Sequence, residues 1–203
     1  MRKAPQQERS QFMVTTILEA TARVFDRRGM ALTTRDVAEE AGVSVGSLYQ
    51  YFKNKEELLS ALVDQLGQAV ADIAMRDIAT RLSLDAREFY RHMLTAIVQL
   101  VAQNPGYQAV ARHWHELRSV NAVHVAEQHL MEAARLYLLQ HHDEYQPKDL
   151  PVSLFISYNS TVYTLVRYFS LQHPPFSIER LIDELTHMMG AYMDHHRKPT
   201  AKG

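Results

Sequence analysis

Apolar residues recur along most of this chain at the three-and-four spacing that marks one face of an α-helix. One stripe ends at Phe25, and another runs from Leu59 to Ile73. Beyond residue 83 the same period, broken by proline, glycine and polar runs, predicts further helices at 85–103, 106–116, 120–141, 150–171 and 177–196. No alternation of apolar and polar residues is long enough to form a strand. The pattern predicts an all-α protein with about nine helices.

Two short helical patterns, TRDVAEEA and VGSLYQYF, follow one another between the longer stripes. Thr33 and Asp36 have the spacing of a capping box before the first. Gly42 can adopt the positive φ that ends that helix, and Ser44 can cap the second. The residues expected to pack the two helices together are Val37, Ala38, Leu48 and Phe52. Two short helices joined by a tight glycine-containing turn are typical of a helix-turn-helix, whose second helix enters the DNA major groove.

The stretch around these helices resembles the DNA-binding part of the tetracycline-repressor (TetR) family. It contains F-x-x-x-G, then T-T-R-x-V-A, then A-G-V-S-x-G-x-L-Y-x-Y-F and K-x-K-E-x-L, within residues 14–62. The resemblance implies a three-helix DNA-binding head at residues 1–54. It also implies a helical ligand-binding and dimerisation domain at residues 55–203. The function implied is that of a homodimeric repressor, released from a palindromic operator by a small ligand.

The resemblance also implies which side chains meet DNA. Gln50 could read adenine, Val45 could contact a thymine methyl, and Gly46 would let the helix approach closely. Arg35 could grip a base edge or a phosphate, or could be a solvated surface charge. The hydroxyl groups and the lysine suit phosphates, although the tyrosines could be packing residues. The predicted DNA-binding residues are Thr33, Thr34, Arg35, Ser44, Val45, Gly46, Ser47, Tyr49, Gln50, Tyr51 and Lys55.

The charge distribution agrees with a DNA-binding head at the N-terminal end. Residues 1–55 contain nine Lys or Arg and six Asp or Glu, a balance of +3. The remaining residues contain 13 basic and 17 acidic side chains, a balance of −4. A basic end on an acidic body favours binding to phosphates.

The last two predicted helices have extensive apolar faces. The helix at 150–171 is apolar nearly all round, and the helix at 177–196 has one apolar stripe. Both could pack inside one subunit. The resemblance instead implies that they pack against their copies as a four-helix dimer interface, which would present two recognition helices to two half-sites.

A small-molecule cavity is expected among the middle helices. Aromatic, methionine and polar residues there would suit a partly aromatic or amphipathic ligand, with Arg167 or a histidine orienting a polar group. The same residues could equally be ordinary core. The candidates are Phe89, Met93, Ile97, His113, Trp114, His115, Tyr158, Asn159, Val162, Tyr163 and Arg167.

Several classes of protein are disfavoured by the residues that are present. The chain has no cysteine, which excludes disulfides, iron–sulfur ligation and thiol nucleophiles. The closely spaced histidines lie one or two residues apart, whereas metal ligands on a helix normally lie three or four apart, so no metal or cofactor is expected. The N-terminus lacks the apolar run of a signal peptide, and no long uncharged apolar stretch occurs, so a soluble, cytoplasmic protein is expected.

Two other functions remain open at this point. One is a helical enzyme centred on His113, Trp114 and His115, although no nucleophile–base set or phosphate loop accompanies them. The other is a dimeric scaffold whose helix-turn-helix contacts protein. The expected function is a regulator without enzymatic activity.

Overall fold

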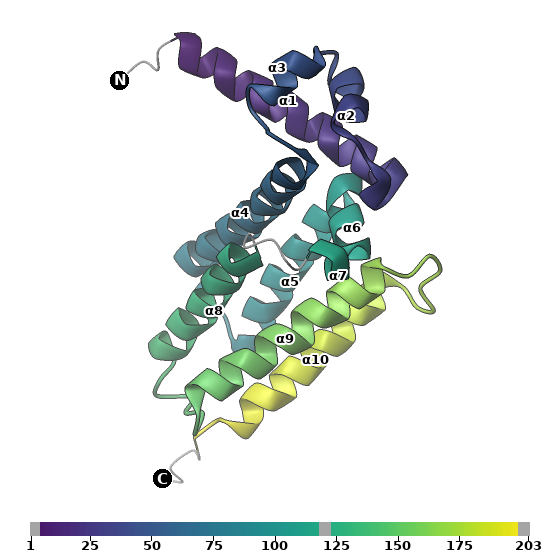
Figure 1. Ribbon diagram of the computed structural model, residues 1–203. Coiled ribbons are helices and arrows are strands. Elements are labelled where there is room, and N and C mark those ends of the chain that lie inside the picture. Colours follow the sequence, from purple (N-terminus) through teal and green to yellow (C-terminus); the bar gives the residue numbers. More distant parts are fainter. Residues whose placement is uncertain (1–4, 118–122, 199–203) are drawn as a thin grey trace, which may run out of the picture. The chain divides into compact units, whose positions relative to one another are not determined.

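The computed structural model describes residues 5–117 and 123–198. Within these ranges the regular secondary structure is helical, apart from one isolated β-bridge between Tyr145 and Arg197 (Figure 1). The elements are α1 (Pro5–Arg28), η1 (Gly29–Ala31), α2 (Thr34–Ala41), α3 (Val45–Tyr49), α4 (Lys55–Arg81), α5 (Ala86–Ala102), α6 (Pro105–Arg112), α7 (Trp114–Leu117), α8 (Val123–Gln140), α9 (Leu150–Phe169) and α10 (Ile178–His195). The predicted all-α class is confirmed, with ten α-helices in the described ranges.

The additional helix arises because the predicted helix at 106–116 is divided at His113. This residue leaves the helical conformation at φ −103° and ψ 20°. Its carbonyl oxygen then accepts the N–H groups of Glu116 and Leu117, which starts a new turn. Neither glycine nor proline marks this break, so helical periodicity alone does not predict it.

The chain forms two compact units. Unit 1 comprises residues 1–66 and 101–123, and unit 2 comprises residues 67–100 and 124–203. The predicted domain boundary after residue 54 falls at the start of α4, a helix that continues from unit 1 into unit 2.

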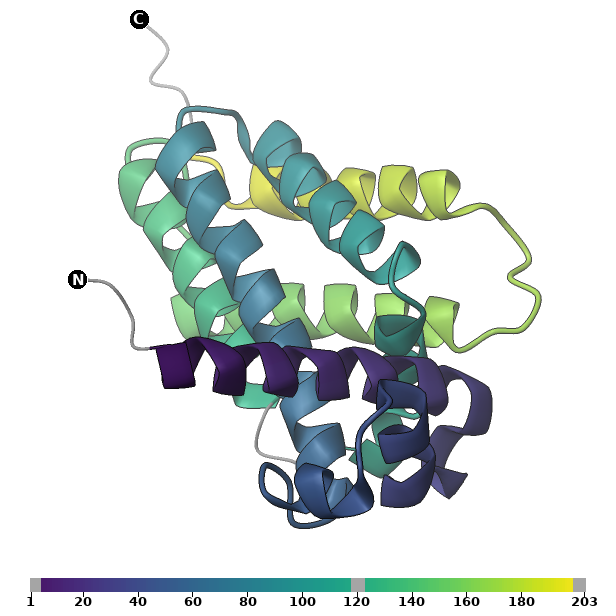
Figure 2. The ribbon, with the colours of Figure 1, turned by 90° about the horizontal axis from the view of Figure 1, so that it is seen from above.

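In unit 1, α1 packs against both α2 and α6, and α2 packs against α3 (Figures 1 and 2). The largest fully buried side chains of this unit include Ile17, Phe25, Leu32 and Leu48. They come from α1, the turn after η1, and α3, so the short helices are anchored on the long first helix. This packing holds the helix-turn-helix in a fixed geometry.

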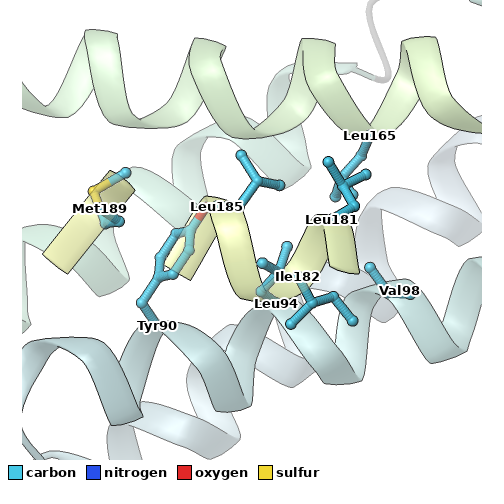
Figure 3. Packing of buried hydrophobic residues seen from close by; sticks show 8 residues of the cluster. All are labelled: Tyr90, Leu94, Val98, Leu165, Leu181, Ile182, Leu185 and Met189. Atoms are coloured by element: carbon cyan, nitrogen blue, oxygen red, sulfur yellow. The ribbon is translucent and has the colours of Figure 1, made fainter. Parts of the chain in front are cut away.

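In unit 2, α5, α9 and α10 pack around a shared apolar core (Figure 3). Helix α5 contributes Tyr90, Leu94 and Val98, α9 contributes Leu165, and α10 contributes four residues on one stripe. A second cluster joins Phe89 and Tyr137, whose rings stack with centroids 4.6 Å apart. Aliphatic and aromatic side chains at helical spacing therefore form the frame of unit 2.

By length and composition, α4 alone among the described helices is apolar enough to cross a membrane. Half of its most apolar window is buried inside the protein, as is usual for a core helix of a water-soluble protein. The feature is weak evidence for a membrane span.

Candidate nucleic-acid interface and ligand cavity

The turn between α2 and α3 is built from the predicted caps. The hydroxyl of Thr33 accepts the backbone N–H of Asp36 at 3.2 Å, and the Asp36 carboxylate accepts the N–H of Thr33 at 3.0 Å. Gly42 ends α2 in the left-handed region at φ 68°. Ser44 then accepts the N–H of Ser47 at 3.0 Å and starts α3. The capping box and the glycine turn are confirmed.

The inner faces of α2 and α3 form the predicted packing. The four residues concerned are all buried: Val37, Ala38, Leu48 and Phe52. Helix α3 ends at Tyr49, earlier than the predicted end at residue 52. The N–H groups of Tyr51 and Phe52 still bond to the Leu48 carbonyl, so the chain turns back towards the core here.

The residues predicted to meet DNA all lie at the surface of unit 1. Exposed are Thr33, Arg35, Ser44, Val45, Gly46, Tyr49 and Gln50, and partly exposed are Thr34, Ser47, Tyr51 and Lys55. Half of the Tyr49 side chain is accessible to solvent, so this residue is a surface group rather than a packing aromatic. The structure therefore gathers these residues on and beside α2 and α3, although their contact with DNA remains a prediction.

Hydroxyl groups on this surface are already paired with one another. The oxygens of Thr34 and Tyr49 lie 3.1 Å apart and join α2 to α3. Those of Ser44 and Ser47 lie 2.8 Å apart, while Thr33 donates to the Asp36 carboxylate at 2.7 Å. These bonds fix where the hydroxyls stand before any ligand arrives.

Much of the basic charge of unit 1 is committed to internal ion pairs. Arg23 and Arg27 both bind the carboxylate of Glu40, and Arg28 binds Asp36 at 3.0 Å. Arg35 is exposed and forms no hydrogen bond or ion pair within the described residues. Arg35 is thus a cation on α2 that remains available to an external anion.

Lys55, which is predicted to contact DNA, also forms a hydrogen bond within the protein. Its ammonium group donates to the carbonyl oxygen of Met30 at 3.1 Å, across 25 residues of sequence. An ammonium carries three N–H donors, so two remain for a phosphate. Replacement of Lys55 would therefore disturb the fold locally as well as any DNA contact.

The paired carboxylates of unit 1 have lowered pKa values. Hydrogen bonds from Thr33, assisted by the charge of Arg28, hold the pKa of Asp36 below its ordinary value of 3.8. Hydrogen bonds from Arg23 and Arg27 likewise lower the pKa of Glu40 from 4.5. Both groups are therefore ionised at neutral pH and maintain the ion pairs.

A cavity of about 140 Å³ lies in unit 2, between α5, α8, α9 and α10. Five of the predicted ligand-binding residues line it: Phe89, Met93, Ile97, Tyr158 and Val162. Other lining residues were not predicted: Tyr90, Leu94, Met131, Tyr137, Thr161, Met189 and Met193 are among them. Their only sequence signal is an apolar helical period, which a cavity wall shares with an ordinary core.

The remaining predicted ligand-binding residues lie elsewhere. Asn159, Tyr163 and Arg167 line a more open hollow on another side of α9. His113, Trp114 and His115 belong to unit 1. Among the residues that the structure describes, neither Arg167 nor a histidine lines the unit 2 cavity.

In the histidine–tryptophan cluster, residues 113–115, the side chains of His113 and Trp114 pack within unit 1. The ring of His113 lies against Phe25, with centroids 5.3 Å apart, and its Nδ1 lies 2.6 Å from the Glu116 carboxylate. The Nε1 of Trp114 is buried and has no hydrogen-bond partner among the described residues. In residues 5–117 and 123–198, no group of three or more His, Asp or Glu side chains could hold a metal ion.

Comparison with known proteins identifies the N-terminal region. Residues 17–62 match the family model of bacterial regulatory proteins of the tetR family. The transcriptional regulator TtgR of Pseudomonas putida is 48% identical over 60 residues, which are 29% of each chain. The transcriptional repressor KstR2 of Rhodococcus jostii is 36% identical over 77 residues, which are 36% of this chain and 38% of that protein. The matches thus span less than two fifths of these relatives.

Solved structures show that the likeness of fold extends beyond the matched segment. A putative TetR-family regulator from Mesorhizobium loti superposes with a TM-score of 0.74 at 14% identity, over 94% of this chain and 99% of that one. FadR from Bacillus subtilis, solved in complex with stearoyl-CoA, gives 0.71 at 18% identity over 87% and 97%. At these identities the comparison concerns the fold alone.

The motif match and the fold together confirm the resemblance found in the sequence. The helix-turn-helix of α2 and α3 lies within the matched segment, and the all-helical architecture is that of solved TetR regulators. This is a family of DNA-binding regulators, not of enzymes. Residues 17–62 thus carry the helix-turn-helix of the tetR family of transcriptional regulators, and the fold of the chain is that of solved TetR-family regulators.

Proposed function

We propose that this protein is a homodimeric repressor that binds two related DNA half-sites and is released by a small ligand in the unit 2 cavity. The main support for this proposal is the outer surface of α2 and α3. Arg35, Tyr49 and Gln50 are exposed there, while the inner faces of both helices are buried. A rigid short helix with exposed polar side chains is suited to the major groove. Such a protein acts where DNA is, in the cytoplasm.

The dimer is supported by apolar side chains left on the outside of α9. Phe155 is 60% exposed, and Val152 and Ile156 are about half exposed. These residues are three and four apart and share one helix face. A solvent-exposed apolar stripe of this kind is typical of a surface covered by another chain. The alternative that α9 packs only within its own subunit leaves this stripe unexplained.

Release by a ligand is supported by the cavity in unit 2. A ligand that prefers a conformation unable to span both half-sites would lower DNA affinity by the difference in its own affinity for the two conformations. A coupling of about 1–3 kcal/mol is typical of such regulation. The likeness to FadR from Bacillus subtilis, solved with stearoyl-CoA, is compatible with a small effector in this fold.

The test is DNA affinity measured by fluorescence anisotropy over a range of salt concentrations. The wild-type protein should bind its own promoter fragment and lose affinity steeply as salt rises, because bound phosphates release counterions. Arg35→Ala should weaken binding by about tenfold or more if Arg35 grips a base edge. If it contacts a phosphate, the salt slope should fall by about one. Arg76→Ala, which removes an exposed arginine from α4, is the matched control.

Gln50→Ala provides the test of base recognition. Loss of a bidentate contact to adenine should cost about 1–3 kcal/mol at one base position and leave other positions unchanged. Absence of binding at low salt would reject the DNA-binding function and favour a scaffold.

A further inference from the structure

The described residues that line the cavity of unit 2 carry no charged side chain. Its twenty described lining residues include no Asp, Glu, Lys, Arg or His. The polar groups that reach it are hydroxyls of serine, threonine and tyrosine. Tyr90, Leu94, Leu165 and Met189, which Figure 3 shows in the core of unit 2, form part of its wall. A negatively charged ligand group would therefore find no counter-ion among the described lining residues.

The pKa values of the tyrosines that line the cavity indicate that a negative charge is unfavourable there. Burial raises the pKa of Tyr90 and of Tyr158 to about 12, and it raises the pKa of Tyr137 further. A raised phenol pKa means that the anion is disfavoured relative to the neutral form. A ligand carboxylate or phosphate would meet the same desolvation penalty, because the hydroxyls cannot replace its lost water shell.

Hydrogen bonds in the wall define two places for a neutral polar group. The single hydroxyl proton of Thr161 is donated to the Ser157 carbonyl at 2.8 Å, so Tyr90 must donate to Thr161 at 2.7 Å. The Tyr90 oxygen is then left as an acceptor. The hydroxyl of Tyr158, in contrast, forms no hydrogen bond within the described residues and is an unused donor.

The remaining wall is apolar and adaptable. It includes four methionines, Met93, Met131, Met189 and Met193, together with the ring of Phe89. Methionine side chains adapt to irregular shapes and make favourable contacts with aromatic rings. A volume of 140 Å³ is close to that of an engineered protein cavity of about 150 Å³ that binds benzene.

We propose that this cavity takes an electrically neutral, largely apolar molecule, the size of a substituted aromatic ring, with one hydroxyl or carbonyl group. This class of ligand deepens the proposed function and rests on it. Tyr158 donates to the ligand oxygen, and the Tyr90 oxygen accepts a ligand hydroxyl. In this proposal neutral hydroxyl groups orient the ligand, instead of the arginine or histidine expected from the sequence.

The experiment is isothermal titration calorimetry with three probes at pH 7 and without DNA: 4-ethylphenol, ethylbenzene and 4-ethylbenzoate. The phenol should bind at least about tenfold more tightly than the carboxylate, because burial of an unpaired charge is costly. Equal or tighter binding of the carboxylate overturns the proposal. Failure of both neutral probes to bind overturns it too.

Two pairs of variants locate the binding. Tyr158→Phe should lower the affinity for 4-ethylphenol about threefold to tenfold and leave that for ethylbenzene unchanged, since it removes one hydrogen bond. Tyr168→Phe, outside this cavity, should change neither. Ala134→Leu fills the cavity and should abolish binding of all neutral probes, whereas Ala79→Leu on the exposed face of α4 should not. Val162→Leu gives the same test with a smaller change in volume.

The design separates this proposal from the repressor function. Binding of neutral probes with no effect on DNA affinity would support the ligand class and reject ligand-controlled release. DNA binding by a protein that prefers the carboxylate would reject the ligand class and leave DNA recognition intact.

Discussion

At the scale of single residues, the charge of the DNA-binding unit differs from what a simple count indicates. Three of its arginines bind the carboxylates of Glu40 and Asp36, so they hold α1 to α2 and are only partly available to an outside anion. Arg35 is exposed and forms no such pair among the described residues. Phosphate affinity therefore depends on which cations are free, more than on the excess of basic residues.

Replacing two glycines of this unit by alanine should change the stability of the protein in opposite directions. Gly29 has φ +54°, and a Cβ there would lie 2.5 Å from the Nε2 atom of the packed His113 ring. Gly29→Ala should therefore lower the free energy of unfolding by about 1–3 kcal/mol. Gly46 lies inside α3, where a Cβ meets nothing closer than the Ser44 hydroxyl at 3.9 Å. Gly46→Ala should leave stability unchanged or raise it by up to about 1 kcal/mol.

Urea unfolding and DNA binding of both variants would check this prediction. Gly46→Ala should still weaken DNA binding, because the new methyl group stands on the outer face of α3. A Gly29→Ala variant as stable as the wild type, or a Gly46→Ala variant that unfolds at lower urea, would contradict this prediction.

Residue-scale features could be predicted from the sequence where they depend on neighbours three or four positions away. Thr33 with Asp36, Gly42 and Ser44 are of this kind, and all take their predicted roles in the turn. The bond from Lys55 to the Met30 carbonyl joins residues 25 positions apart, and the contact of Gly29 with His113 joins residues farther apart still. No local pattern specifies such contacts, because they arise only when distant helices pack.

At the scale of secondary-structure elements, α2 depends on its N-terminal cap and on two carboxylates with lowered pKa. The pKa of Asp36 is lowered mainly by Thr33, and that of Glu40 by Arg23 and Arg27. A carboxylate whose pKa is lower in the folded state stabilises the fold above its unfolded value. This stabilisation is lost as the pH falls through the folded pKa.

The free energy of unfolding should therefore decrease on acidification below about pH 4.5, near the ordinary value for a glutamate. Asp36→Asn and Glu40→Gln should each make this decrease less steep. Thr33→Ala should cost about 0.5–2 kcal/mol at neutral pH, since it removes the cap. Chemical denaturation between pH 7 and pH 3 gives the measurement, and an acid dependence identical in all variants would contradict the assignment.

Element types were predictable because helical periodicity is strong throughout the chain, but some boundaries were not. The break at His113 carries no glycine or proline, and the early end of α3 at Tyr49 follows from the return of Phe52 to the core. The cavity was predictable only in part. A residue such as Val162 on its wall and a residue such as Leu185 in the core have the same spacing, and only packing distinguishes them.

At the scale of the whole molecule, the proposed function requires two copies of the chain. One short recognition helix such as α3 offers few base contacts, and a two-fold pair of them doubles the contacts and fixes their spacing. The exposed stripe on α9, with Phe155 at its centre, is the surface that we assign to the partner chain.

Phe155→Asp should therefore convert a dimer into a species with the 23.4 kDa mass of one chain, because it places a charge in the apolar contact. Met75→Asp is the matched control, since Met75 is also about half exposed but lies on α4. Light scattering coupled to gel filtration measures both masses. An unchanged mass for Phe155→Asp, or a monomeric wild type, would exclude this interface.

The most direct test of the central claim is selection of bound duplexes from a random DNA pool by the wild-type protein. We expect enrichment of an inverted repeat whose half-site centres lie about 34–36 Å apart, or a multiple of that spacing. Arg35→Ala should bind the selected duplex less tightly than Arg76→Ala. A pool that shows no enrichment even at low salt, or that yields only single, unpaired half-sites, would contradict the account.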